Sequence, residues 1–242
     1  MPLVDHNQRH LHLKLVYYGP GFGGKTTNLR YIHRRSDPRH RGRLISMQTE
    51  AERTLFFDLL PVELGRFRGY RVRLHLCTVP GQAALAATRR LILRGVDAVV
   101  FVADSQPAAV DRNRESWIDL ERALRGQGRS ISDIPLVVQY NKRDLDRILT
   151  IEELRTALSF DGAPPEVEAS AMEGWGVFRT LKLATSEALR GAGDPRKAPQ
   201  GRTPSILPGR RASLFPGGVP DAAHEPTASI PPMPPLPTSE ED

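Results

Sequence analysis

The sequence predicts an α/β fold in which a mostly parallel sheet of six or seven strands is flanked by helices. Strand-like and helix-like segments alternate from residue 11 to about residue 190, as they do where crossover helices join parallel strands. The segments 96–103 and 134–140 are nearly unbroken apolar runs. Such runs are typical of strands that helices cover on both faces.

Six strands and five helices account for this alternation. Strands are expected over residues 12–18, 44–48, 54–60, 71–78, 96–103 and 134–140, and helices over 25–34, 86–94, 111–125, 151–158 and 175–190. In 111–125, Trp117, Leu120 and Leu124 recur at helical spacing with charges opposite them, which predicts packing against the sheet. Residues 1–10 read as a polar lead-in.

The composition changes near Gly191 and divides the chain in two. Residues 192–242 hold 12 of the 21 prolines and almost no aromatic residue. Such a segment buries too little apolar area to offset the entropy of ordering it. We therefore expect a folded domain over 1–191 and a proline-rich disordered tail over 192–242. Within the tail, Ser213 follows two arginines as in a kinase site and 231–237 favours polyproline II, although a passive tail is the simpler interpretation.

Composition limits the setting and the partners. The 242 residues include a single cysteine, Cys77, so no disulfide forms within the chain and a cytoplasmic setting is expected. The first residues show no signal-peptide pattern, and no apolar run approaches the ~18 residues of a membrane span. The net charge of +6 comes from basic clusters that we interpret as solvated surface. Without a zinc spacing or an aromatic–basic motif, nucleic acid is not an expected partner.

A glycine-rich motif follows the first predicted strand and leads into the first predicted helix. Residues 19–26 read Gly-Pro-Gly-Phe-Gly-Gly-Lys-Thr. The glycines let backbone N–H groups converge on an anion, and the helix N-terminus adds its dipole. Lys25 can reach the β- and γ-phosphates, and the Thr26 hydroxyl can ligate Mg²⁺. The motif predicts a P-loop, with nucleotide-binding residues Gly19, Gly21, Phe22, Gly23, Gly24, Lys25, Thr26 and Thr27.

The same residues also spell a dinucleotide-binding fingerprint, from Gly19 to Gly24. That motif requires an acidic residue about 20 positions on, at the end of the second strand. Residues 43–47 contain no acid, and Glu50 and Glu52 come later. The P-loop is therefore the favoured interpretation.

A second motif indicates which base is bound. Asn141-Lys142-Arg143-Asp144 directly follows the strand over 134–140, and ligands bind at such strand ends in open α/β sheets. Asp144 can accept from guanine N1–H and the 2-amino group, a pair that adenine lacks. Asn141 can bond N7, and the Lys142 stem can stack on the base. The backbone N–H groups of Ser170, Ala171 and Met172 are further candidates, for guanine O6.

The catalytic candidates lie between these two motifs. Gly81, which follows Thr78-Val79-Pro80, can place its N–H against a γ-phosphate, and Gln82 can orient the attacking water. Small GTPases usually have aspartate where Thr78 stands, to hold a Mg²⁺-bound water. Further upstream, Thr54 can complete the Mg²⁺ shell, and Arg53 can neutralise charge on the γ-phosphate.

Five segments together resemble the MglA family, the bacterial Ras-like GTPases of gliding motility and cell polarity. They are residues 16–21, 53–58, 78–82, 102–105 and 139–144. The resemblance covers residues 12–190 and includes Thr78, since threonine is typical of this family at that position. It implies a P-loop NTPase with a Ras-like G domain that binds GTP, GDP and Mg²⁺.

The resemblance also implies how the chain works. Hydrolysis should be slow until a roadblock-fold MglB-like dimer, the activating protein, positions Arg53 and Gln82, which are catalytic with Lys25. A strand within 44–60 should slide between nucleotide states, and the GTP form should act on polarity or motility effectors at a cell pole.

Two alternatives stay open. The tail beyond Gly191 departs from the family and suggests a paralogue with other partners. Together with Thr78, it leaves open a GTP-binding scaffold that hydrolyses little. An ATP-specific P-loop enzyme is the other alternative, against which Asn141, Lys142 and Asp144 argue.

Overall fold

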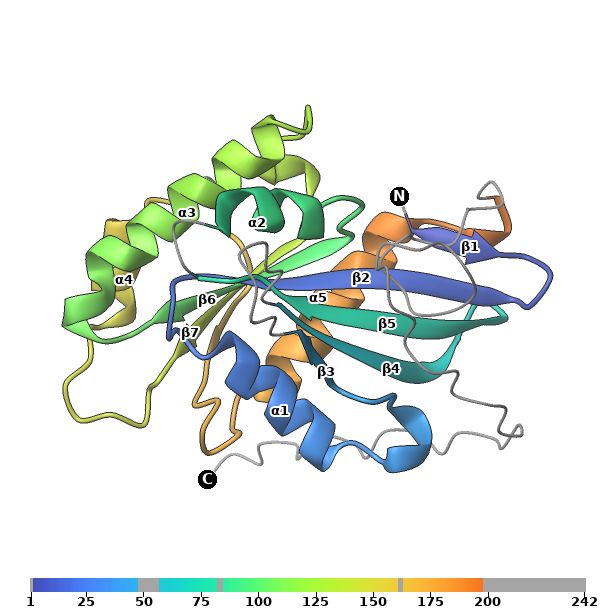
Figure 1. Cartoon of the computed structure of the whole chain (residues 1–242), viewed down its shortest axis with the longest axis horizontal. Coiled ribbons are helices and arrows are strands. Elements are labelled where there is room, and N and C mark those ends of the chain that lie inside the picture. Colours follow the sequence, from blue (N-terminus) through green and yellow to red (C-terminus); the bar gives the residue numbers. More distant parts are fainter. Residues whose placement is uncertain (1, 48–56, 82–84, 161–162, 198–242) are drawn as a thin grey trace, which may run out of the picture.

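The chain forms one sheet with helices on both faces (Figure 1). The computed structural model describes residues 2–47, 57–81, 85–160 and 163–197. The strands are β1 (Leu3–Asp5), β2 (His10–Tyr18), β3 (Ile45–Met47), β4 (Phe57–Phe67), β5 (Tyr70–Thr78), β6 (Ala98–Asp104), β7 (Leu136–Asn141) and β8 (Glu166–Glu168). Their order is β3-β4-β5-β2-β6-β7-β8, and β1 pairs with β2. The pairs β2–β5, β2–β6, β6–β7 and β7–β8 are parallel, and the other three are antiparallel.

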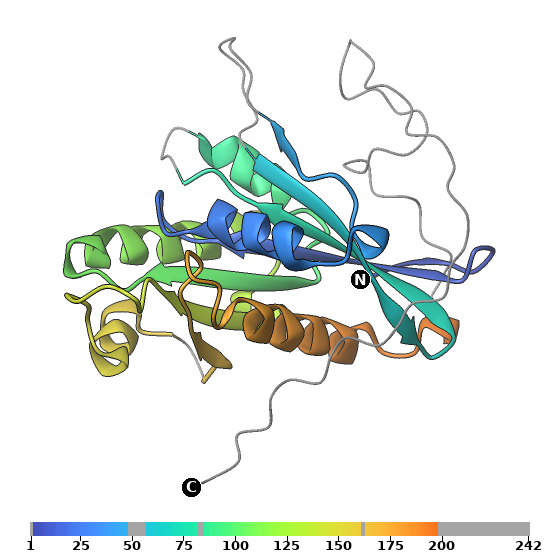
Figure 2. The same ribbon diagram turned by 90° about the horizontal axis from the view of Figure 1, so that it is seen from below.

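The α-helices of the described residues cover the two faces of the sheet, as Figures 1 and 2 show. They are α1 (Lys25–Arg35), α2 (Ala86–Ile92), α3 (Val110–Arg125), α4 (Ile151–Leu158) and α5 (Val177–Ala192). The structure has two hydrophobic cores, and the residues of β2 alternate between them. Leu13 and Leu15 belong to the core under α1 and α5, while Val16 and Tyr18 belong to the core under α2, α3 and α4. All seven residues of β6 are buried, which explains why its first six residues are apolar.

The α/β fold and the mostly parallel sheet are confirmed, and every predicted strand and helix has a counterpart in the structure. Helix α3 buries Trp117, Leu120 and Leu124 as its spacing predicted. Helix α4 begins at a capping box, in which Thr150 and Glu153 bond each other's backbone N–H groups.

The sheet has eight strands among the described residues, where six or seven were predicted. Strand β8 was missed because it has three residues, of which only Val167 is buried. The interpretation of residues 1–10 as a lead-in was wrong. Leu3–Asp5 forms β1, which pairs antiparallel with β2 and buries Val4. One apolar residue in a polar context is too weak a periodic signal to predict a strand.

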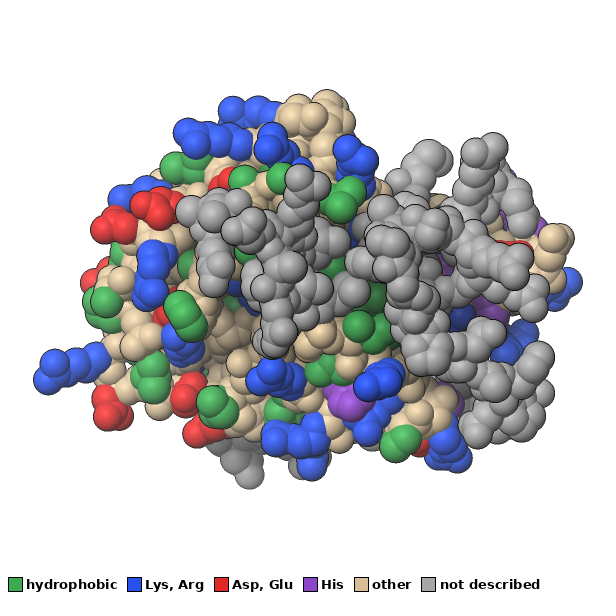
Figure 3. All heavy atoms as spheres, in the orientation of Figure 1, with side chains coloured by type: hydrophobic (Ala, Val, Ile, Leu, Met, Phe, Trp, Pro, Cys, Tyr) green, Lys and Arg blue, Asp and Glu red, His purple; other side chains and the backbone are tan. Residues whose placement is uncertain are grey.

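The chain continues past α5 to the edge of the sheet. A helical turn covers Pro195–Lys197, and Asp194 pairs with Arg68 in the turn between β4 and β5. Residues 198–242 lie outside the described residues, so the disorder of the tail and the domain boundary stay predictions. None of the described helices has the length and hydropathy to span a bilayer. On the face in Figure 3, Lys and Arg side chains are spread over the surface, with acidic side chains among them at the α4 end.

Candidate nucleotide-binding site

The glycine-rich loop joins β2 to α1 at the carboxyl edge of the sheet. Gly24 has a φ of 98° and is the N-cap of α1, whose first amides therefore face the loop. A Cβ at Gly24 would lie 2.1 Å from Asn141 Nδ2, and one at Gly19 would lie 2.3 Å from the Val102 carbonyl oxygen. Only glycine fits at these two positions. The Phe22 side chain is 88% exposed, so this residue can serve a phosphate only through its backbone.

The Lys25 ammonium lies against the loop. Its Nζ donates to the carbonyl oxygens of Gly19 at 2.8 Å and Pro20 at 2.6 Å. Burial, and to a lesser extent the charge of Arg89, lower the pKa of Lys25 to about 8, while Asp58 opposes the shift. A buried cation that donates to carbonyl oxygens gains from an anionic ligand, which suits contact with phosphates.

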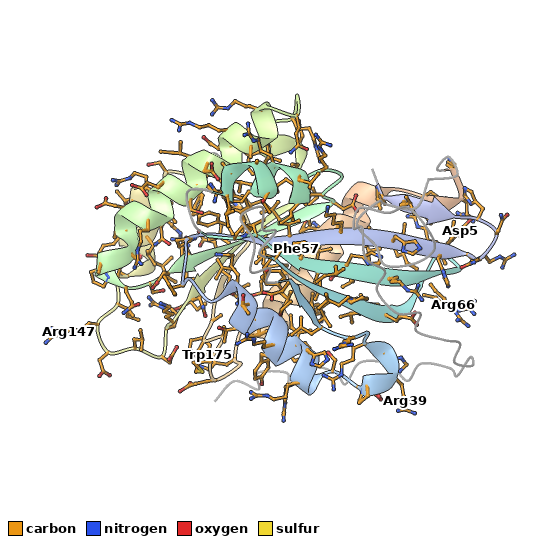
Figure 4. All side chains as sticks on the ribbon, viewed as in Figure 1. Asp5, Arg39, Phe57, Arg66, Arg147 and Trp175 are labelled. Carbon is orange, nitrogen blue, oxygen red and sulfur yellow. The ribbon has the colours of Figure 1, made fainter. Side chains whose placement is uncertain are left out.

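Asp58 of β4 joins the loop to β5. Its Oδ2 accepts from Thr26 Oγ1 at 2.6 Å and from Thr78 Oγ1 at 2.9 Å. Its Oδ1 accepts from Ser46 Oγ at 2.6 Å, and its backbone N–H donates to Thr78 Oγ1 at 2.8 Å. Figure 4 labels the neighbouring Phe57 at the start of β4. The sequence reasoning missed Asp58, although an acid beside Phe57, Leu59 and Leu60 was a signal that could have been read.

The chemistry of this cluster fits a magnesium ion. Mg²⁺ prefers oxygen ligands and is usually held by one or two carboxylates together with phosphates and waters. Asp58 places a buried carboxylate beside the Thr26 hydroxyl, the predicted metal ligand. It also touches Thr78, at the position where small GTPases usually have aspartate. A carboxylate from the neighbouring strand therefore lies beside this position.

The predicted base-binding loops meet the phosphate loop through Asn141. Its Nδ2 donates to the Gly23 carbonyl oxygen at 2.8 Å, and its Oδ1 accepts from the Ala171 N–H at 2.8 Å. Lys142 donates to Asp104 Oδ2 at 2.7 Å and to Gln106 Oε1 at 2.9 Å. The structure therefore brings the phosphate loop together with two segments that lie more than 100 residues further along the chain.

Asp144 and Met172 complete the base-binding loops at the surface. Asp144 is exposed, and the Met172 side chain is 74% exposed. Ser170 is buried and its Oγ accepts from the Glu173 N–H, which shapes the loop that carries the backbone donors. This arrangement leaves the Asp144 carboxylate accessible to a base.

Comparison with known proteins agrees with this geometry. The model of the ADP-ribosylation factor (Arf) family matches residues 48–193. Over 189 residues the chain is 51% identical to the mutual gliding-motility protein MglA of Myxococcus xanthus (strain DK1622), covering 78% of this chain and 96% of that protein. The chain is a small GTPase of the Arf family, of the MglA type. As a member, it binds guanine nucleotide and hydrolyses GTP.

A buried amide pair supports the phosphate loop of this MglA-type GTPase. Asn28 Nδ2 donates to Gln139 Oε1 at 2.8 Å, and Gln139 Nε2 donates back to Asn28 Oδ1 at 3.0 Å. Gln139 Nε2 also donates to Thr180 Oγ1, and Asn28 Nδ2 to the Gly24 carbonyl oxygen. The pair therefore fixes α1 and the loop on β7 and α5. Sequence reasoning missed this pair, because the two amides lie 111 residues apart and no sequence pattern links them.

The structure describes only some of the residues that are predicted to act in hydrolysis. Gly81 lies against the phosphate loop, since a Cβ there would be 2.4 Å from Gly21 Cα. This contact suits a backbone donor to the γ-phosphate. Arg53, Thr54 and Gln82 lie outside the described residues, so their roles stay predictions.

Nucleotide affinity should fall as pH rises above about 8. The Lys25 pKa of about 8 holds for the chain without nucleotide, and bound phosphates raise it. Above pH 8 binding must therefore take up a proton, and the association constant should fall toward about tenfold per pH unit. A titration with a fluorescent GDP analogue from pH 7 to pH 9 measures this, because phosphate itself ionises near pH 6. A constant affinity over that range would contradict the pKa assignment.

Proposed function

We propose that this protein is a GTP/GDP molecular switch whose nucleotide state is read by strand β4. The observation that carries the proposal is the contact of Asp58 with both Thr26 and Thr78. One carboxylate on β4 therefore touches the phosphate loop and the strand that leads to Gly81. A change of phosphate or metal at Thr26 would act on β4 through this carboxylate.

The proposed hydrolysis is an in-line attack of water on the γ-phosphate. The amides of the phosphate loop and Lys25 hold the phosphates, while Thr26, Asp58 and Thr54 would hold the metal. When bound, Mg²⁺ would neutralise charge on the β- and γ-phosphates. Gln82 orients the water and Arg53 balances the charge that develops on the transferring group. Asn141, Asp144 and the loop from Ser170 to Met172 select guanine.

Hydrolysis should be slow alone and faster with an MglB-like roadblock-fold dimer. Arg53 and Thr54 precede β4, and Gln82 directly follows Gly81, so a partner that binds over β4 can act on both segments. β4 is suited to movement, because within the described residues its outer side is paired by the three-residue strand β3 and by a single bridge between Arg41 and Val62. Its pairing with β5 is also irregular between Glu63 and Arg66. A short outer partner and a register shift reduce the number of bonds that sliding must break.

For the cellular role, we propose regulation of polarity or motility. The support is the 51% identity to a protein named for mutual gliding motility. The GTP form would act on effectors from the cytoplasm and be recruited to a cell pole.

A GTP-binding scaffold with little hydrolysis is the alternative, and Thr78 favours it. Single-turnover GTP hydrolysis, with and without the roadblock-fold dimer from the same genome, separates the two. The switch predicts slow turnover alone and clear stimulation by the dimer. GTP binding without stimulation would favour the scaffold.

A further inference from the structure

A partly buried ion pair outside the sequence motifs connects two segments that face the phosphate site. Arg89 of α2 donates from Nε to Asp119 Oδ2 of α3 at 2.6 Å. The same carboxylate oxygen accepts from the hydroxyl of Tyr18, the last residue before Gly19. Arg89 Nη1 donates in turn to the Pro80 carbonyl oxygen at 3.3 Å. Asp119 therefore contacts Tyr18, which precedes the phosphate loop. It also contacts Arg89, which bonds Pro80, the residue before Gly81.

Tyr18 and Arg89 are buried and Asp119 is partly buried, so the arrangement is costly unless the Arg89 charge is paired. Tyr18 is 0% exposed and Arg89 is 7% exposed. Burial and the bond to Asp119 raise the pKa of the Tyr18 hydroxyl, so it stays a donor. A desolvated guanidinium needs a carboxylate partner, and removing one member of such a pair is strongly destabilising. Arg89 is thus fixed in place and can fix what it touches.

The bond to Pro80 determines where the Gly81 N–H points. The Pro80 carbonyl and the Gly81 N–H belong to one peptide group, and in a trans peptide they point in opposite directions. Arg89 holds the carbonyl toward α2 and α3. The N–H is therefore directed away from those helices. The close approach of Gly81 to Gly21 shows that the phosphate loop lies beside this peptide.

We propose that Arg89, with Asp119 and Tyr18, positions the Pro80–Gly81 peptide and so sets the preference for GTP over GDP. The inference rests on the proposed function and on the predicted contact of the Gly81 N–H with the γ-phosphate. GDP has no γ-phosphate, so these residues should matter for GTP and little for GDP. They are positioning residues, since none of them touches the nucleotide in this account.

Arg89→Ala tests the inference through a ratio of affinities. Removing the guanidinium frees the Pro80–Gly81 peptide, so the affinity for a non-hydrolysable GTP analogue should fall about tenfold relative to GDP. The measurement is competition against a fluorescent GDP analogue with Mg²⁺. Arg90→Ala is the matched control, because Arg90 is the next residue of α2 and its side chain is exposed. It should leave the ratio unchanged.

Two milder variants keep the inference testable if Arg89→Ala does not fold. Arg89→Lys keeps the charge but cannot reach Asp119 and Pro80 together, and Tyr18→Phe removes only the hydroxyl. Both should shift the ratio in the same direction by a smaller factor. An unchanged ratio in all variants that fold, including equal losses for GTP and GDP, would overturn the inference. The proposed function is tested separately by wild-type binding of both nucleotides.

Discussion

Gln82→Leu and Arg53→Ala should each remove most of the GTP hydrolysis that a roadblock-fold partner stimulates. In the proposed mechanism Gln82 orients the attacking water, and leucine cannot form the necessary hydrogen bonds. Arg53 balances the charge on the transferring phosphoryl group, and an arginine in that role is worth about a thousandfold or more in rate. Single-turnover hydrolysis with saturating partner is the measurement, and a loss of about two to three orders of magnitude is expected.

Arg147→Ala is a suitable control for Arg53→Ala. Arg147 is exposed, and Figure 4 shows its side chain pointing away from the body of the molecule. This control should keep full stimulation by the partner. GDP binding should be unchanged in all three variants, which separates loss of catalysis from loss of the fold. Unchanged stimulation in both Gln82→Leu and Arg53→Ala would contradict the mechanism.

Asp58→Asn should uncouple nucleotide binding from Mg²⁺. Asparagine keeps the size of the side chain and removes the charge that a cation needs. Replacing a residue that holds the ligands of a metal ion in place typically lowers the metal affinity by about 10–100-fold. In the wild type, Mg²⁺ should slow the release of a fluorescent GDP analogue. In the variant, about 10–100-fold more Mg²⁺ should be needed for the same slowing.

Asp111→Asn is the control for Asp58→Asn, because the Asp111 side chain is 88% exposed at the start of α3. It should leave the Mg²⁺ titration unchanged. A wild-type Mg²⁺ dependence in Asp58→Asn would show that another group holds the ion. Thermal unfolding of both variants checks that the loss of the buried charge has not unfolded the sheet.

The periodicity of the sequence was sufficient to predict the type of the long strands and helices. Buried strands such as β6 and amphipathic helices such as α3 carry many residues of one pattern, so their type is secure. Strand β4 was predicted to end at residue 60 but runs to Phe67. Pro61 and Gly65 interrupt its pattern, and the structure accommodates them in a strand that has a register shift after Glu63.

The sequence could indicate candidate site residues where these residues are close together in the chain. The phosphate loop is contiguous, and Asn141 follows its strand at the expected end. Asp58 was not predictable in this way, because its role depends on the pairing of β4 with β5 and on α1 lying beside both. Asp119 and Arg89 are likewise ordinary charged residues of helices until the packing of α2 on α3 brings them together.

Hydrogen–deuterium exchange on the full chain, loaded with GDP or with a non-hydrolysable GTP analogue and Mg²⁺, tests the central claim most directly. The account predicts different protection in peptides from β3 and β4 between the two states. Peptides from β6 and β7 should be equally protected in both, since these strands lie in the parallel part of the sheet away from Asp58. Identical exchange in β3 and β4 with both nucleotides bound would contradict a switch that is read by β4.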